Sequence, residues 1–221
     1  MFKKKSIIVS LTKKFYKMLF LKHKLFPGSE EYWNQRYNSG GDSGFGSNNH
    51  LAEFKAEIIN DFVKNNDVRT IIEYGCGDGN QLKLAEYPSY IGFDISPKAI
   101  KSCDRIFQDD QNKKFKLMYK ENIRETANLT LSLDVIYHLI EDDIYHSYME
   151  LLFDSSKRFV IIYSSNYDEE QRYQIKRRHF TKWVEKNRSQ WKLIHHIPNR
   201  FPYNGDIKAS SRSDFYIYKK D

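Results

Sequence analysis

Residues 71–82 read IIEYGCGDGNQL, an apolar run followed by glycine at every second position. The apolar residues predict a short buried strand over residues 70–74, and the glycines predict a tight turn at its end. Glycine suits such a turn because it adopts positive φ without strain and lets a ligand approach the backbone. We expect a helix to begin near Asn80. The G-x-G-x-G spacing differs from the G-x-G-x-x-G dinucleotide fingerprint and so disfavours a nicotinamide-dependent oxidoreductase.

A second short apolar strand is predicted over residues 90–94, and it ends in Asp94. Asp94 lies nineteen residues after Gly75, close to the offset of about 20 residues at which nucleotide-binding folds place a ribose-binding acid. Ser96 and Pro97 are typical of a helix start, as N-cap and first-turn residue. The pattern therefore predicts a βαβ unit with a ribose site at Asp94. The alternative is a structural Asp94 that caps the helix or forms an ion pair.

Further along the chain, apolar runs alternate with amphipathic stretches. Five alternations of strand and helix predict a parallel sheet that is covered by helices on both faces. Only a loop separates the last two predicted strands, so the last strand should run antiparallel. The remaining strands are expected over residues 115–119, 129–134, 158–163, 191–197 and 215–218. The helices are expected over residues 30–37, 50–62, 97–107, 141–153 and 181–187.

The Glu73–Gly79 motif, with its acid two residues before the first glycine, resembles motif I of class I S-adenosylmethionine-dependent methyltransferases. The segment SLDVIYHL at residues 132–139 adds support. The resemblance covers about Tyr32 to Tyr218. It implies an α/β, Rossmann-like fold with a seven-stranded, mostly parallel sheet, an antiparallel last strand and helices on both faces. It also implies a transferase that uses S-adenosyl-L-methionine.

The resemblance also implies the cofactor contacts. The methionine end would meet Glu73 and the backbone of the glycine turn. Asp94 would take both ribose hydroxyls, because a carboxylate accepts two hydrogen bonds side by side. Ile95 would pack on the adenine, whereas residues 120–122 stand where related enzymes place an acid for the adenine amine. Asp78 is either a turn residue or a site residue. The expected cofactor-binding residues are Glu73, Gly75, Cys76, Gly77, Gly79, Asp94, Ile95 and Asp134.

The expected catalytic residues are Asp134 and His138, which follow the fourth predicted strand. The resemblance places residues near the transferred methyl group at this point of the fold. Histidine titrates close to neutral pH and can accept a proton from a hydroxyl. The alternative is that His138 packs at a helix start with its ring bonded to the backbone.

A basic cluster follows the fifth predicted strand and suggests an acceptor site. Arginine's planar fork suits phosphate or carboxylate, so these side chains could capture an anionic acceptor. The alternative is a solvated helix face. The expected substrate-binding residues are Tyr137, Arg172, Arg177, Arg178 and Arg200. No metal site is expected, because neither His195-His196 nor the two cysteines can be extended to a ligand set.

The 221 residues match one α/β domain with extensions, and the net charge is +7. Residues 1–29 hold eight lysines and no acid, so the remaining residues carry 28 basic and 29 acidic side chains. We therefore expect a basic amphipathic extension over 1–29 and a methyltransferase domain over 30–221. The domain's charge argues against a nucleic-acid partner. Two cysteines are too few for a disulfide framework and favour a cytoplasmic protein.

The basic extension is predicted to form an amphipathic helix. Ile8, Leu11, Phe15 and Leu19 share one face of a helical wheel, and lysines take the other. The lysines interrupt the apolar run, so no membrane span is expected, and residues 7–11 are too short for the core of a signal peptide. The helix either docks on the domain or frays in solvent. Alternatively, residues 1–26 contact a membrane surface or a partner.

Residues 39–49 are rich in glycine and serine and lack apolar periodicity. Mobile polar loops of this kind commonly close nucleotide sites, so the segment could be a lid. It could equally be a plain linker.

The reaction implied by the resemblance is an in-line attack of a nucleophile on the methyl group of a sulfonium. Positioning supplies most of the rate, and a base helps only where the nucleophile carries a proton. We expect O-methylation of a small molecule, a sugar or a glycan precursor, with an anionic acceptor if the arginines bind it. The alternatives are an RNA methyltransferase that uses the basic tail and a non-catalytic cofactor-binding module.

Overall fold

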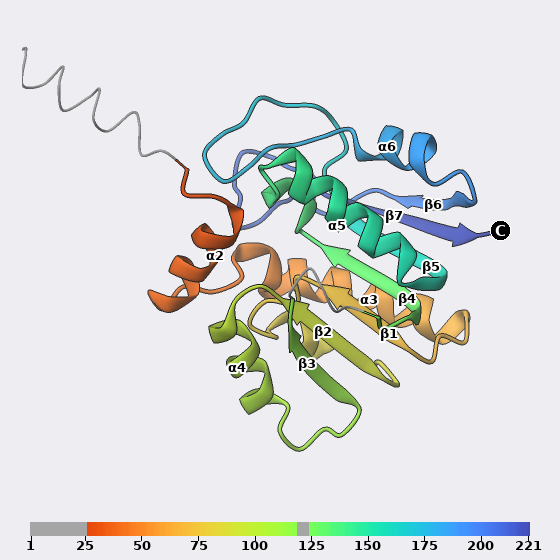
Figure 1. The fold of residues 1–221 in the computed structure, drawn as a ribbon, viewed down its shortest axis with the longest axis horizontal. Helices are drawn as coiled ribbons and strands as arrows, with labels where there is room; N and C mark the ends of the chain where they lie inside the picture. Colours follow the sequence, from red (N-terminus) through yellow and green to blue (C-terminus); the bar gives the residue numbers. More distant parts are fainter. Residues whose placement is uncertain (1–25, 119–123) are drawn as a thin grey trace, which may run out of the picture.

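The computed structural model describes residues 26–118 and 124–221. The predicted N-terminal helix and residues 120–122 lie outside these ranges. Seven strands form one sheet in the order β3-β2-β1-β4-β5-β7-β6 (Figure 1). The strands are β1 (Ile71–Tyr74), β2 (Tyr90–Asp94), β3 (Lys113–Leu117), β4 (Ala127–Leu133), β5 (Ser156–Ser164), β6 (Trp191–Ile197) and β7 (Asp214–Lys220).

The direction of the strands confirms the predicted fold class. Strands β1 to β5 pair in parallel, and β7 lies antiparallel between β5 and β6. A loop without a helix joins β6 to β7, which allows the chain to return in the opposite direction. The sheet is therefore an α/β, Rossmann-like sheet with an antiparallel last strand.

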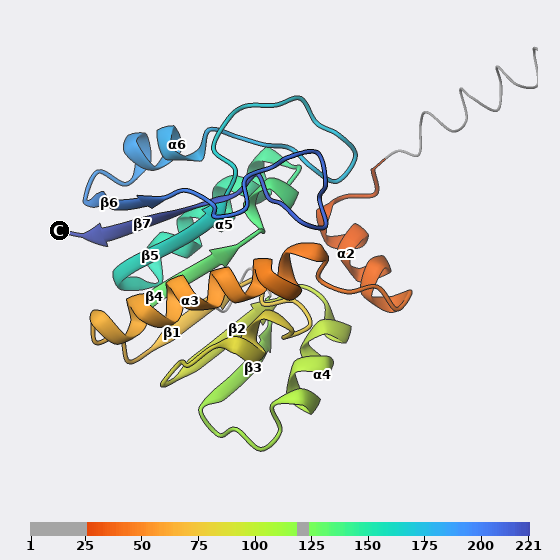
Figure 2. The ribbon, with the colours of Figure 1, turned by 180° about the vertical axis from the view of Figure 1, so that it is seen from behind.

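Helices cover both faces of the sheet. The α-helices are α2 (Ser29–Asn38), α3 (Asn49–Asn65), α4 (Pro97–Ile106), α5 (Asp142–Asp154) and α6 (Phe180–Asn187). Seen from behind, α3 crosses in front of the strands, whereas α5 lies on the opposite face (Figures 1 and 2). The described residues contain no helix of the length and apolarity that a bilayer span requires.

The two cores follow the alternation of side chains along the strands. In β5, Phe159, Ile161 and Tyr163 pack into the core that contains α3. The intervening Val160 and Ile162 pack into the core that contains α5 and α6. All five of these side chains are buried, as expected for a central strand that is covered on both faces.

A helix does begin beside Asn80, as predicted, but it is too short to cover the sheet. The chain forms only a single 3₁₀ turn, η2 (Gln81–Leu84), before it reaches β2. Leu82 and Tyr87 are buried in the core and hold this crossover against the sheet. Ala85 is already extended, and Pro88 excludes a longer helix, because proline lacks the backbone donor and restricts the residue before it.

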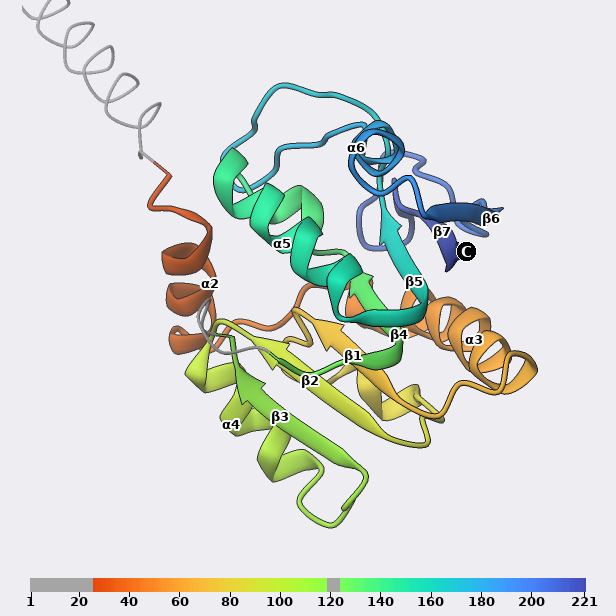
Figure 3. The same cartoon turned by 45° about the vertical axis from the view of Figure 1, so that its right-hand side comes forward.

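Helix α2 stands apart from both layers, beside the carboxyl ends of the strands (Figure 3). Its first residue, Ser29, is tied to the loop after β4. The Ser29 hydroxyl donates to the His138 carbonyl oxygen at 2.8 Å and accepts from the Ile140 N–H at 3.0 Å. The Ser29 N–H donates to Glu141 Oε1 at 2.9 Å. These bonds fix α2 across the edge of the sheet where ligands bind in open α/β folds.

Candidate active site

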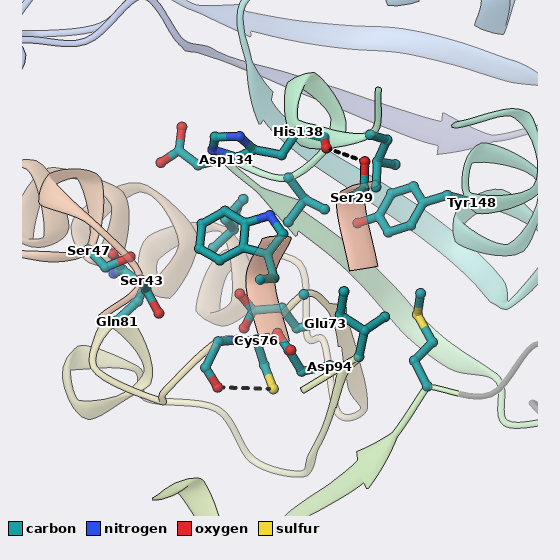
Figure 4. Close-up of a pocket in the computed structure, with 18 of the residues that line it drawn as sticks. Ser29, Ser43, Ser47, Glu73, Cys76, Gln81, Asp94, Asp134, His138 and Tyr148 are labelled. Carbon is teal, nitrogen blue, oxygen red and sulfur yellow. Dashed lines mark hydrogen bonds between the residues drawn. The ribbon is translucent and has the colours of Figure 1, made fainter. Parts of the chain in front are cut away.

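A pocket with about 810 Å³ of empty space, part of it open to solvent, lies at the carboxyl ends of β1, β2 and β4 (Figure 4). Its floor is the glycine turn after β1. Trp33 and Tyr37 from α2 and Lys55 from α3 form part of its wall. The remaining side chains come from the ends of the neighbouring strands, so the pocket occupies the position predicted from the strand-end motifs.

The glycine turn requires glycine where it meets the loop after β4. Gly75 has φ of 80° and donates its N–H to the Phe93 carbonyl oxygen at 2.7 Å. A Cβ atom on Gly75 would lie 2.5 Å from Val135 Cγ2, so any side chain there would collide with the neighbouring loop. The turn therefore brings bare backbone to the pocket.

Asp94 is buried at the end of β2 and holds two backbone donors. Its Oδ2 accepts the Gly77 N–H and its Oδ1 accepts the Ser96 N–H, both at 2.9 Å. Burial raises the pKa of Asp94 to about 6, against the lowering effect of these backbone bonds. A carboxylate has about four acceptor positions. Asp94 can therefore hold the turn and still accept hydroxyl groups, so the structural and ribose-binding roles are compatible.

Glu73 is buried on β1 and also lines the pocket. Its Oε2 accepts the Tyr90 hydroxyl at 2.7 Å. Burial raises the pKa of Glu73 to about 7, with the Tyr90 bond and the charge of Lys55 opposing this shift. The pocket therefore presents a second carboxyl group that changes its charge near neutral pH.

The loop between α2 and α3 packs onto the glycine turn. Ser43 donates its N–H to Asp78 Oδ2, and Asp78 returns its own N–H to Ser43 Oγ, both at 3.1 Å. Tyr37 Oη lies 3.0 Å from Ser43 Oγ. Asn80 Nδ2 donates to the Ser47 carbonyl oxygen at 2.6 Å. The loop is thus fastened over the pocket, and Asp78 acts as its anchor rather than as a wall of the pocket.

Asp134 follows β4 in the left-handed region, with φ of 60°. Its Oδ2 accepts from Lys55 Nζ at 3.0 Å. Its Oδ1 accepts from Tyr137 Oη and from Ser213 Oγ, both at 3.0 Å. Three separate segments therefore meet at one carboxylate, namely α3, the loop after β4 and the loop before β7, which explains how an unfavourable backbone conformation is maintained there.

His138 lies on the short 3₁₀ helix η3 (Ile136–His138). Its Nδ1 lies 2.8 Å from the Gln174 carbonyl oxygen, which can only accept, so Nδ1 carries the proton. Its Nε2 has no hydrogen-bond partner among the described residues. Burial lowers the pKa of His138 to about 4, so the imidazole is neutral at pH 7. The backbone bond expected in the alternative interpretation is thus present, and it leaves the second nitrogen unpaired.

A second pocket, of about 1100 Å³, lies on the other side of His138. Trp33, Asp134 and His138 line both pockets, so the two spaces meet at these residues. Arg36, Ile207 and Ser210 belong to the second pocket alone. Its walls come from α2, from the loop after β5 and from the loop between β6 and β7.

The structure brings together most of the residues predicted to contact the cofactor. Those that line the first pocket are Glu73, Gly75, Cys76, Gly77, Asp94, Ile95 and Asp134. Gly79 does not line it. A Cβ atom on Gly79 would lie 3.0 Å from Cys103 Sγ and 3.0 Å from the Phe107 ring, so this glycine allows α4 to pack closely.

The predicted acceptor residues separate into two groups. Tyr137 and Arg177 line the second pocket, whereas Arg172, Arg178 and Arg200 line neither pocket. Arg178 donates to the Leu139 and Ile140 carbonyl oxygens, at 2.7 and 2.9 Å. The other two arginines are exposed and form ion pairs. Arg172 pairs with Glu169 on its own loop, and Arg200 pairs with Glu57 on α3.

Several residues that line the pockets were not predicted. Lys55 had a detectable signal, because it lies on the apolar face of α3, four residues after Leu51 and three before Ile58. A charged residue at such a position requires a buried partner. Trp33, Arg36 and Arg212 had no comparable signal, since each is placed by the packing of distant segments.

A model of the methyltransferase-domain family matches residues 47–202. Magnesium protoporphyrin IX methyltransferase (ChlM) from Synechocystis PCC 6803, solved with bound S-adenosylmethionine, is 15% identical with a TM-score of 0.64, over 90% of this chain and 100% of that chain. The N-methyltransferase NodS from Bradyrhizobium japonicum WM9, solved with S-adenosyl-L-homocysteine, is 10% identical with a TM-score of 0.65, over 87% and 98%. The methyltransferase domain of bacterial CtHen1-C is 16% identical with a TM-score of 0.58, over 75% and 96%. No curated protein matches the sequence.

The fold and the pocket at its strand ends define a class I methyltransferase. The chain belongs to the family of methyltransferase domains, whose model matches more than half of it. It is an S-adenosylmethionine-dependent methyltransferase, and S-adenosylmethionine is its cofactor.

The residues of the first pocket fit this cofactor. Gln81 Oε1 is buried without a hydrogen-bond partner in the described part of the chain, so it offers an acceptor to the ammonium group of the methionine end. Asp94 offers acceptor positions to the ribose hydroxyls, and Ile95 and Met118 offer apolar surface to a flat base. When bound, S-adenosylmethionine supplies a methyl group on a sulfonium, which is already activated for transfer.

Proposed function

We propose that the enzyme methylates a hydroxyl group of a small molecule, a sugar or a glycan precursor, and that this acceptor binds in the second pocket. The observation that carries the proposal is the position of His138. Its ring lies where the two pockets meet, and Nε2 has no hydrogen-bond partner among the described residues. A hydroxyl that reaches this nitrogen would stand between the acceptor space and the cofactor space.

In this proposal His138 acts as a general base. The Gln174 carbonyl oxygen holds the Nδ1 proton, so Nε2 is the nitrogen that accepts the hydroxyl proton. The low pKa of His138 keeps the imidazole neutral and ready to accept. Burial disfavours the imidazolium that forms during transfer, and the charge of Asp134 offsets this effect only in part.

The second pocket suits a small acceptor better than a macromolecule. It has about 1100 Å³ of empty space, part of which is open to solvent, and its lining includes the polar residues Ser210, Ser211 and Ser213. The preference for a sugar or glycan precursor rests on the resemblance to short methyltransferases, which often modify such compounds. No contact in this pocket carries that preference.

An RNA methyltransferase is the second candidate, and one sequence feature favours it. Residues 1–29 hold eight lysines and no acid, which would suit binding to phosphates. RNA affinity that falls steeply with salt and disappears when residues 1–26 are deleted would support this candidate.

The proposal is tested by incubating the full-length protein with a metabolite extract and S-adenosylmethionine that carries a labelled methyl group. We expect the label to appear on the oxygen of a small molecule. Label on nucleic acid, label on nitrogen or carbon, or no labelled product would contradict the proposal. A parallel incubation with cellular RNA provides the comparison with the second candidate.

A further inference from the structure

The second pocket carries more positive than negative charge on its walls. Three arginines line it, namely Arg36, Arg177 and Arg212. Asp134 is the only acidic residue among its lining residues, and this carboxylate is already paired with Lys55. The space where the acceptor is proposed to bind is therefore electropositive.

The carboxylates that partner two of these arginines lie outside the pocket lining. Arg36 pairs with Asp42 at 2.9 Å, and Arg177 pairs with Glu169. Glu169 also pairs with Arg172, at 2.6 Å. The single negative charge of Glu169 is thus shared by two guanidinium groups, so one positive charge remains uncompensated.

Arg212 has no carboxylate partner among residues 26–118 and 124–221. Its guanidinium lies 3.6 Å from the centroid of the Tyr203 ring, and its Nη1 lies 3.5 Å from Tyr167 Oη. The Arg177 guanidinium lies over the ring of the same Tyr167, at 5.7 Å from its centroid. Two like charges from different loops are thereby held around one tyrosine.

An anionic ligand would complement this arrangement. Two guanidinium groups repel each other, and an anion placed between them would turn that repulsion into two attractive contacts. Arginine's planar fork matches the oxygens of carboxylate and phosphate, and such charged hydrogen bonds are the strong ones. The pocket therefore favours an anionic ligand over a neutral one.

Apolar side chains stand beside this charge at the pocket. Phe45 is 47% exposed and Ile207 is 62% exposed, and both line the pocket together with Tyr203. Neighbouring exposed apolar groups of this kind commonly mark a surface that a ligand covers. The ligand therefore needs an apolar portion as well as an anionic group.

We propose that the acceptor is a hydroxyl compound that joins a carboxylate or phosphate group to an apolar ring or chain, and that its anionic group binds between Arg177 and Arg212. This inference rests on the proposed function, because it uses the second pocket as the acceptor site. Binding of the anion fixes the orientation of the acceptor, and the apolar portion packs against Phe45 and Ile207.

The test compares phenyl phosphate with phenol as binding probes. Full-length protein saturated with S-adenosylhomocysteine is titrated with each probe by calorimetry at constant ionic strength. We expect phenyl phosphate to bind at least about tenfold more tightly than phenol, and Arg212→Gln to weaken phenyl phosphate binding by about 10- to 100-fold, as expected for charged hydrogen bonds. Arg69→Gln removes the same charge at an exposed position outside the pocket lining and should change the affinity less than twofold.

Equal affinities for the two probes, or an equal loss in Arg212→Gln and Arg69→Gln, would overturn the inference. S-adenosylhomocysteine binding is measured in the same proteins and shows that each variant is folded. The proposed function is tested separately. If it is wrong, the extract screen yields no O-methylated small molecule, whatever the calorimetry shows.

Discussion

Lys55 Nζ lies 3.0 Å from Asp134 Oδ2, and the lysine side chain is only 1% exposed. The pair joins α3 to the loop after β4, at the boundary between the two pockets. An ion pair that is removed from water contributes little net stability, but removing one partner leaves an uncompensated buried charge. Lys55 and Asp134 therefore have to be considered as one unit.

The first prediction concerns this pair. Lys55→Met should lower the free energy of unfolding by about 3–5 kcal/mol, because Asp134 would keep its charge without the ammonium group. Urea unfolding measures the change. Lys64→Met, at an exposed position of the same helix, is the control and should change stability by less than about 0.5 kcal/mol. Equal stability of both variants would mean that the ion pair does not exist in solution.

A second prediction concerns His138 as a base. If the acceptor is a hydroxyl, His138→Ala should lower turnover by roughly 10²–10⁴-fold, the usual range for a positioned base. The affinity for S-adenosylhomocysteine should hardly change. His195→Ala, on the exposed strand β6, should keep wild-type turnover. A His138→Ala enzyme with wild-type turnover would show that no base acts here, as expected for an acceptor whose oxygen is already anionic.

The raised pKa of Glu73 predicts how stability without cofactor depends on pH. Because the folded protein holds this proton up to about pH 7, Glu73 contributes stability at low pH that is lost as the pH rises from about 4 through 7. When the pH is raised from 5 to 8, the free energy of unfolding of the wild type should therefore fall by about 2–3 kcal/mol more than that of Glu73→Gln. Chemical unfolding at both pH values provides the measurement. An identical pH dependence of the two proteins would contradict a raised pKa.

The basic extension leads to a fourth prediction, which rests on the sequence alone. We propose that residues 1–26 contact membrane surfaces, because apolar residues and lysines fall on opposite faces of the predicted helix. The full-length protein should bind anionic vesicles at low salt and release them as salt rises. Deletion of residues 1–26 should abolish this binding and leave cofactor affinity intact, since the pocket lining begins at Ser29. A full-length protein that ignores such vesicles would refute the proposal.

The sequence predicted the sheet because the signals were local. Strand β5 is buried on both faces and holds a continuous apolar run over residues 159–163, whereas β4 alternates leucine with small polar residues. Gly75 and Asp94 were predictable for the same reason, since a strand, a tight turn and a terminal acid follow one another within a few residues. The direction of β7 followed from the missing helix after β6.

The acceptor side was less predictable because it depends on contacts between distant segments. A sequence shows an arginine but not the carboxylate that it will meet. Arg200 and Glu57 are 143 residues apart and form a surface ion pair. Arg212 stands in no sequence pattern of its own and reaches the pocket only because its loop folds back toward Tyr167. No local pattern distinguishes these two arginines.

The central claim is that the pocket around Asp94 binds S-adenosylmethionine, and one calorimetric comparison tests it most directly. Wild-type protein and Asp94→Ala are titrated with S-adenosylmethionine at pH 7.5, above the pKa of about 6 that burial gives Asp94. We predict that the variant binds more weakly by about 1–3 kcal/mol, or about 5- to 150-fold, because hydrogen bonds to a charged carboxylate are lost. An unchanged affinity in a folded Asp94→Ala protein would contradict the claim and move the cofactor away from β2.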